Sequence, residues 1–282
     1  MVTKNKDYKI YEKTFIKQEK EVLVLTSDIN GGARKMDNSW VCINDILAYI
    51  DTETNELHKG DGSITWLISD EEYEKFGIYW PYNFRQGVIY RIKVRELKDK
   101  TIPEGFLPSV ANELMIAKVF EETIQNKILI DILNEYRKPV ILSDSELGEF
   151  VLDKDLRMFT GTIMWLEKKV FVYLDVQVDN QISWTKAINN LRKLSKSQEN
   201  FDLELRQFAV DRLLDTANSW QEEVNKPKLT QNEFKQRISL SGLSLNSNKF
   251  EFDFSNDIIF RGHSIRISGN INNGLKRAEI VG

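Results

Sequence analysis

The sequence is poor in the residues that most metal centres and nucleophilic catalysts require. It contains one cysteine, Cys42, and two histidines, His58 and His263. A single cysteine excludes an internal disulfide, and together with two histidines it is too little for a zinc site built from cysteine and histidine. An all-oxygen metal site stays open, but the sequence has no EF-hand loop. We therefore predict no metal site and no cofactor.

Motifs that mark common enzymes and nucleotide-binding proteins are also missing. The sequence has no phosphate-binding G-x-x-x-x-G-K-[ST] loop, no dinucleotide fingerprint G-x-G-x-x-G and no nucleophile elbow G-x-S-x-G. Cys42 has apolar neighbours on both sides, where a thiol usually packs as a small hydrophobic side chain. These observations favour a protein without catalytic activity.

Long apolar runs are absent as well. No stretch approaches the roughly 20 apolar residues that a membrane-spanning helix needs, and the first residues carry mixed charge rather than the apolar core of a signal peptide. The formal net charge of −4 gives the chain no overall attraction to nucleic acid or to anionic lipid. We expect a cytoplasmic protein with no membrane association, and the lone cysteine suits a reducing compartment.

The length of 282 residues allows two domains of about 100–200 residues each. Short apolar runs and a period of two over residues 88–95 predict a strand-rich N-terminal domain over residues 1–102. Prolines punctuate the next segment, and apolar residues at three- and four-residue spacing predict a long helix over 110–137, within a linker region of 103–142. A C-terminal α+β domain is expected over 143–282.

Within the C-terminal domain, the pattern predicts a β-hairpin over 159–178 followed by helices near 185–194 and 201–220. Thr230 and Glu233 have the spacing of a capping box and predict a further helix start, as Ser69 and Glu72 do in the N-terminal domain. Alternating phenylalanines over 250–254, a strand region over 258–271 and an Asn-Asn-Gly turn predict sequential strands at the end of the chain. Together these patterns indicate an α+β fold with an antiparallel sheet and two to three helices.

His263 is the first candidate functional residue. On a regular strand it shares a face with Ile265, which points toward the core, but a bulge at Gly262 would reverse its direction. With Asp253 or Asp257 as a partner, His263 would form an acid/base pair for a hydrolase or a transferase. The competing interpretation is a buried histidine that stabilises the bulge.

A second candidate is a strand face that carries Arg91, Lys93 and Arg95, preceded by the aromatic residues Trp80 and Tyr82. Basic sheet faces with aromatic residues bind single-stranded nucleic acids in some proteins. However, residues 1–100 contain 16 Lys and Arg against 17 Asp and Glu, a net charge of −1. That balance is unlike a nucleic-acid-binding domain and favours a solvated face.

The C-terminal region resembles a bacterial domain family of unknown function. The resemblance covers about residues 145–282 and rests on the capped segment Leu229–Phe234, on the string Gly262-His263-Ser264-Ile265 and on the closing Ala278–Gly282. An aromatic residue often precedes that glycine in the family, whereas Arg261 stands here. The resemblance implies an intracellular bacterial protein and supplies no activity. Residues 1–100 show no such resemblance.

Our leading hypothesis is therefore a non-catalytic protein-binding module of an immunity or regulatory type. An acidic balance suits the masking of a basic partner, and the many aromatic residues could anchor an interface. The alternatives are the acid/base enzyme that uses His263 and the single-strand-binding protein that uses the Arg91, Lys93 and Arg95 face. The sequence favours no particular oligomeric state.

Overall fold

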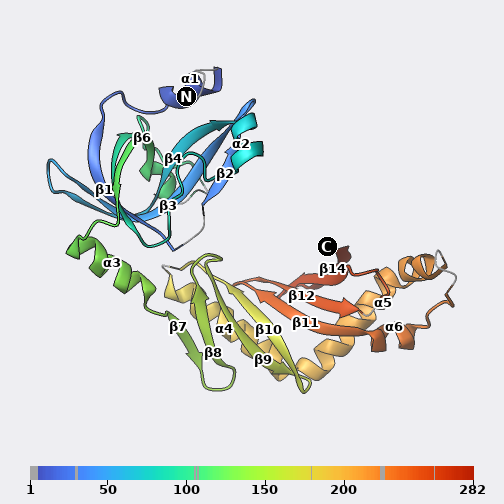
Figure 1. Ribbon diagram of the computed structural model, residues 1–282. Helices are drawn as coiled ribbons and strands as arrows, with labels where there is room; N and C mark the ends of the chain where they lie inside the picture. The colour runs from blue at the N-terminus through green and yellow to red at the C-terminus, as the bar shows by residue number, and fades with distance from the viewer. Residues whose placement is uncertain are drawn as a thin grey trace. The chain divides into compact units, whose positions relative to one another are not determined.

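The computed structural model describes residues 6–282 except 29, 30, 105, 107, 179, 223–225 and 257. The chain divides into two compact units, Met1–Lys138 and Pro139–Gly282, which we call the N-terminal unit and the C-terminal unit (Figure 1). Each unit has its own sheet and its own helices, and the predicted α+β class is confirmed.

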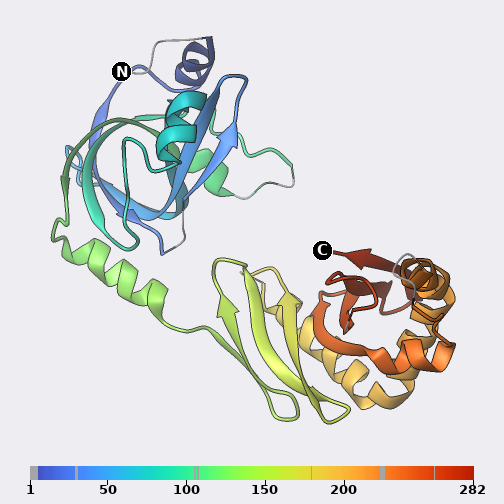
Figure 2. The same ribbon diagram turned by 45° about the vertical axis from the view of Figure 1, so that its right-hand side comes forward.

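The N-terminal unit is built around a closed barrel (Figure 2). The strands follow the order β1-β5-β6-β4-β3-β2, and β3 also pairs with β1. Five strands thus close on themselves, and β2 only extends the edge of β3. Every pair is antiparallel except β4 with β6. This connectivity is that of the five-stranded OB barrel.

The elements of the unit are α1 (Lys6–Lys13), β1 (Lys20–Thr26), β2 (Gly32–Lys35), β3 (Ser39–Asp51), β4 (Leu57–Ser69), α2 (Asp70–Phe76), β5 (Ile89–Glu96), the 3-10 helix η1 (Pro108–Asn112), β6 (Glu113–Glu122) and α3 (Lys127–Arg137).

Two helices cover much of the outer surface of this barrel. Leu129 and Leu133 of α3 pack against an outward apolar cluster that includes Leu25 of β1. Tyr11 of α1 packs with a second cluster, on β3, β4 and β6, and its hydroxyl forms a 2.6 Å hydrogen bond with the Thr65 hydroxyl. Exposed positions remain on β2, in the first half of β4, at Arg91 of β5 and in the second half of β6.

The long helix predicted over residues 110–137 is wrong in its first half. Residues Glu113–Glu122 form β6, and only Lys127–Arg137 are α-helical, with the Asn126 side chain capping the helix start. β6 closes the barrel between β4 and β5, which buries Leu114 and Ile116 inside it. This tertiary closure outweighs the helical spacing of the apolar residues.

The C-terminal unit is a two-layer structure. Its eight strands follow one another in the order β14-β13-β12-β11-β10-β9-β8-β7. The predicted antiparallel sheet contains one parallel pair, β10 with β11, because the chain crosses between these strands through all three helices. The elements are β7 (Ile141–Asp144), β8 (Gly148–Asp153), β9 (Met158–Trp165), β10 (Lys168–Asp175), α4 (Gln181–Lys196), α5 (Gln198–Glu222), α6 (Gln231–Arg237), β11 (Ile238–Leu245), β12 (Lys249–Asn256), β13 (Ser264–Asn270) and β14 (Gly274–Val281).

The core of this unit lies between the sheet and its helices. Phe250, Phe252 and Phe254 of β12 point into it, as the alternating pattern predicts, and meet apolar residues of α4 and α5 such as Leu191 and Leu205. The helices lie against this one face of the sheet (Figure 1). Across the ranges that the structure describes, no helix of this unit packs on the opposite face, and no helix of the chain is long and apolar enough to cross a membrane.

Two capping boxes form as predicted. The Ser69 hydroxyl accepts the Glu72 backbone N–H at the start of α2, and the Thr230 hydroxyl accepts the Glu233 backbone N–H at the start of α6; each glutamate returns the bond. The strand predicted over 258–271 is shorter than expected. It begins only at Ser264, after a turn in which both Arg261 and Gly262 have positive φ.

Candidate functional site

The predicted basic strand face is largely neutralised by carboxylates of the same unit. The Arg91 Nε lies 2.5 Å from Glu21 Oε1, and Arg95 contacts Glu12 at 2.7 Å and Glu19 at 2.9 Å. Hydrogen bonds to these carboxylates raise the pKa of both guanidinium groups. Two of the three predicted cations are therefore held in ion pairs.

Lys93 has a different environment from its two neighbours. It lies directly opposite Lys118 of β6 in the antiparallel pair. In the part of the chain that the structure describes, neither ammonium group lies within ion-pair distance of a carboxylate. Both approach the ring of Phe120 instead, Lys93 at 5.9 Å and Lys118 at 4.9 Å from its centre, and Arg91 Cζ lies 5.7 Å from it. We call Arg91, Lys93, Lys118 and Phe120 the β5–β6 patch.

The predicted aromatic residues lie in the loop before β5. Trp80 is 40% exposed and stacks on Phe76 at 4.3 Å. Tyr82 lines a hollow of about 240 Å³, and Phe120 of the β5–β6 patch lines the same hollow. The remaining lining residues are Pro81, Asn83, Phe84, Tyr90, Val119, Glu121 and Glu122. Burial raises the pKa of the Tyr82 hydroxyl. The structure thus joins Tyr82 to the β5–β6 patch through Phe120.

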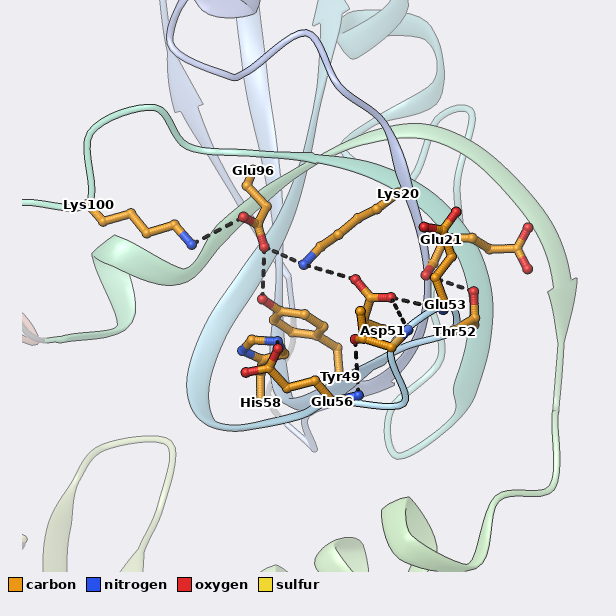
Figure 3. Close-up of polar contacts among 11 residues, drawn as sticks. Lys20, Glu21, Tyr49, Asp51, Thr52, Glu53, Glu56, His58, Glu96 and Lys100 are labelled. Atoms are coloured by element: carbon orange, nitrogen blue, oxygen red, sulfur yellow. Dashed lines mark hydrogen bonds and ion pairs between the residues drawn. The ribbon is translucent and has the colours of Figure 1, made fainter.

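A polar network closes one end of the barrel (Figure 3). Lys20 Nζ contacts Glu96 and lies 3.6 Å from Asp51 Oδ2. The Tyr49 hydroxyl donates to Glu96 at 3.1 Å, and Lys100 Nζ reaches the other oxygen of Glu96 at 3.2 Å. Burial opposes ionisation of Asp51 and Glu96, but hydrogen bonds from neighbouring backbone N–H groups for Asp51, and from Lys20 for Glu96, lower the pKa of both carboxyl groups.

His58 completes this network. Its ring stacks on Tyr49 with centres 4.4 Å apart, and its Nε2 lies 3.7 Å from Glu56 Oε2. Both rings line a hollow of about 290 Å³ beside Lys59 and Asn112. The carboxylates at the centre of the network are bonded to donors of the same unit, so its evident role is to stabilise the barrel end.

His263 lies in the turn just before β13. Its backbone N–H donates to the Phe260 carbonyl at 2.9 Å, and its own carbonyl accepts from Asn256 Nδ2 at 2.6 Å. Its half-buried ring meets the edge of Trp220, with centres 5.9 Å apart. The turn therefore holds the backbone of His263 in place.

The two predicted carboxylate partners of His263 have separate outcomes. Both oxygens of Asp253 accept from Arg266, at 2.8 Å and 3.1 Å, and among the described residues no hydrogen bond or ion pair joins Asp253 to His263. Asp257 lies outside the described residues. An acid/base role for His263 stays a prediction.

The remaining chemical groups offer little reactivity. Cys42 is buried, and burial raises the pKa of its thiol to about 12, so that the thiol is protonated at neutral pH. Within the described ranges, no group of three or more His, Cys, Asp or Glu residues is placed to hold a metal ion.

The C-terminal unit exposes apolar side chains on the sheet face that its helices leave open. We call this set the open-face strip: Ile141, Val151, Met164 and Phe171, with 46%, 44%, 58% and 63% of their surface exposed. They come from the four successive strands β7 to β10, and their chain neighbours on β8 to β10, such as Phe150, Ile163 and Val170, point into the core. Polar and charged side chains usually occupy a solvated sheet face, so this composition is unusual.

Comparison with known families divides the chain at the same place as the structure. Residues 144–280 match the family described as "Uncharacterized protein conserved in bacteria (DUF2262)". The C-terminal half resembles a bacterial family of unknown function. Residues 7–136 match "Domain of unknown function (DUF7021)", for which the sequence motifs gave no indication. Neither the curated proteins nor the solved structures gave a match.

The open-face strip thus lies mainly in the DUF2262 region and the β5–β6 patch in the DUF7021 region. Sequence reasoning missed Lys118 and Phe120 because it placed both on a helix. It also missed the open-face strip, because the sequence does not show whether a helix covers the outward face of the sheet. The alternation shows that one set of side chains faces away from the core, and Phe171 belongs to that outward set.

Proposed function

We propose that this chain is a cytoplasmic, non-catalytic protein-binding module that docks its partner on the open face of the C-terminal sheet. The observation that carries the proposal is the open-face strip, with Phe171 as its most exposed member. Contiguous exposed apolar surface is uncommon on soluble proteins and marks interaction sites. Phenylalanine and methionine are enriched in the centres of protein interfaces.

The strand register places the strip as two pairs of apolar side chains, with Thr160 and Thr162 of β9 between them. Ile141 lies directly opposite Val151 across β7 and β8. Met164 pairs with Lys169, so Phe171 is its diagonal neighbour on β10, within reach of long side chains. Sheet faces pack well against a second flat apolar layer. The strip therefore suits a partner that presents an extended apolar face rather than a single side chain.

The charges beside the strip indicate the chemistry of the partner. The outward positions of β8 and β10 carry the carboxylates Glu149, Asp153 and Asp175 against one ammonium group, that of Lys169. None of these four forms an ion pair with another residue that the structure describes. The strip would therefore be complementary to a protein with an apolar centre and a rim of lysine and arginine.

The test is capture from the native host with matched variants of the full chain. We expect the tagged wild-type chain to recover one stoichiometric protein, which Phe171→Ser with Met164→Ser fails to recover. Leu203→Ser is the control, because Leu203 is 65% exposed on α5, away from the strip. The purified partner should then rebind the wild type and the control in isolation. Equal recovery by the strip variant would contradict the proposal, as would a homodimer in light scattering that the strip variant abolishes.

A further inference from the structure

Two register shifts between β5 and β6 determine which side chains form the β5–β6 patch. The register between β5 and β6 shifts once between Arg91 and Ile92 and again between Lys93 and Val94. The shifts leave Ala117 and Phe120 as extra residues on β6. A bulge redirects the side chains that follow it, and bulges are frequent beside functional sites. Here they bring Lys118 and Phe120 to the outer face, while Val119 contacts the core.

The patch carries a charge arrangement that is unfavourable for the free protein. Like charges directly opposite in an antiparallel pair repel, and Lys93 faces Lys118 in this way. Two carboxylates near the patch are engaged elsewhere: Glu21, opposite Lys93 on β1, with Arg91, and Glu122 with Arg85 at 3.4 Å. A phosphate group between the two ammonium groups would remove their repulsion and neutralise both charges.

The aromatic part of the patch adds a second kind of recognition. Phe120 is 39% exposed, and the hollow beside it is lined by Tyr82 as well as by Glu121 and Glu122. A nucleobase can stack on an exposed phenylalanine, and a carboxylate can accept its exocyclic amino group. A polyanion without bases would contact the lysines but would make no use of the Phe120 ring or the carboxylates.

We infer that the β5–β6 patch binds single-stranded nucleic acid, with a phosphate between Lys93 and Lys118 and a base on Phe120. The proposal is independent of partner docking by the open-face strip. It also departs from the OB barrel's usual use, because that fold binds ligands on the face of its second and third strands. Those strands are β3 and β4 here, and Tyr11 of α1 packs on them at Val41 and Leu67.

The test measures fluorescence anisotropy of a labelled single strand of about 10 nucleotides, within the site size of OB folds. With two to three phosphates neutralised, affinity should fall roughly 7- to 18-fold between 50 and 200 mM salt. Lys93→Ala or Lys118→Ala should weaken binding and make it less dependent on salt. Phe120→Ala should weaken it roughly 5- to 150-fold with little change in that dependence.

Matched controls and competitors decide the outcome. Lys276→Ala, on β14, and Phe106→Ala, another exposed phenylalanine, should bind as the wild type does. Circular dichroism of each variant checks that it is folded. Absence of binding at 50 mM salt would overturn the inference. Equal binding of the duplex, or of a free mononucleotide, would overturn it too, since either would show that a stacked single strand is not what the patch recognises.

Discussion

The two units of this chain leave different surfaces free. The N-terminal barrel closes on itself, and α1 and α3 pack on much of its exterior, so that the β5–β6 patch is a limited cationic and aromatic area. The C-terminal sheet is covered on one side only, which leaves the apolar open-face strip, with carboxylates beside it, on the other side. In each unit the position of the helices, more than the strands themselves, determines which chemistry is available for binding.

The largest expected effect contrasts the two faces of the C-terminal sheet. Phe252 is fully buried, with its ring 5.4 Å from Trp165 and 5.5 Å from Phe201. Phe252→Ala should lower the free energy of unfolding of this unit by about 3–5 kcal/mol. Phe171→Ala, on the open face, should change it by no more than about 0.5 kcal/mol. Urea denaturation followed by circular dichroism measures both, and similar losses would show that the open face is packed in the native protein.

A smaller effect tests the polar network of the barrel. Lys20→Met leaves Asp51 and Glu96 without their shared cation in a half-buried site, and should destabilise the N-terminal unit by about 1–3 kcal/mol. Lys100→Met is the control, because Lys100 contacts the same Glu96 from an exposed position and should contribute at most about 1 kcal/mol. Equal urea midpoints for the two variants would refute a stabilising role for Lys20.

The same network predicts how the barrel responds to acid. The folded-state pKa values of Asp51 and Glu96 lie below their ordinary values of 3.8 and 4.5. The stability from these groups is therefore present above the ordinary range and is lost as the pH falls through the lowered folded values. The pKa of Asp144 in the C-terminal unit is lowered as well, so the free energy of unfolding of both units should decrease in acid. Lys20→Met should reduce the acid dependence of the N-terminal unit alone, which denaturation at pH 7 and pH 3 would measure.

Whether a feature could be predicted depended on how far apart in the sequence its interacting residues lie. The capping boxes at Ser69 and Thr230 depend on residues three positions apart, and the alternation of Phe250, Phe252 and Phe254 is equally local. β6 was missed because its partners β4 and β5 are distant in sequence and its bulges disturb the period of two.

The candidate sites show the same limit. Arg95 looks free in the sequence, but it is neutralised by Glu12 and Glu19, more than 70 residues away. The facing of Lys93 and Lys118 exists only once the barrel has closed. A strand pattern can tell which side chains leave the core, whereas it cannot tell which distant charges or helices will meet them.

The smallest effect asks whether the β5–β6 patch is maintained for binding rather than for stability. Lys118→Glu replaces the repulsion across the strands by an attraction to Lys93, and should stabilise the free N-terminal unit by about 0.2–1 kcal/mol. The same change should abolish single-strand binding, because the phosphate would meet a carboxylate. Lys276→Glu controls for the change in net charge. A destabilised Lys118→Glu variant would mean that Lys118 supports the fold, chiefly through the Phe120 ring at 4.9 Å, and that no ligand is needed to explain its position.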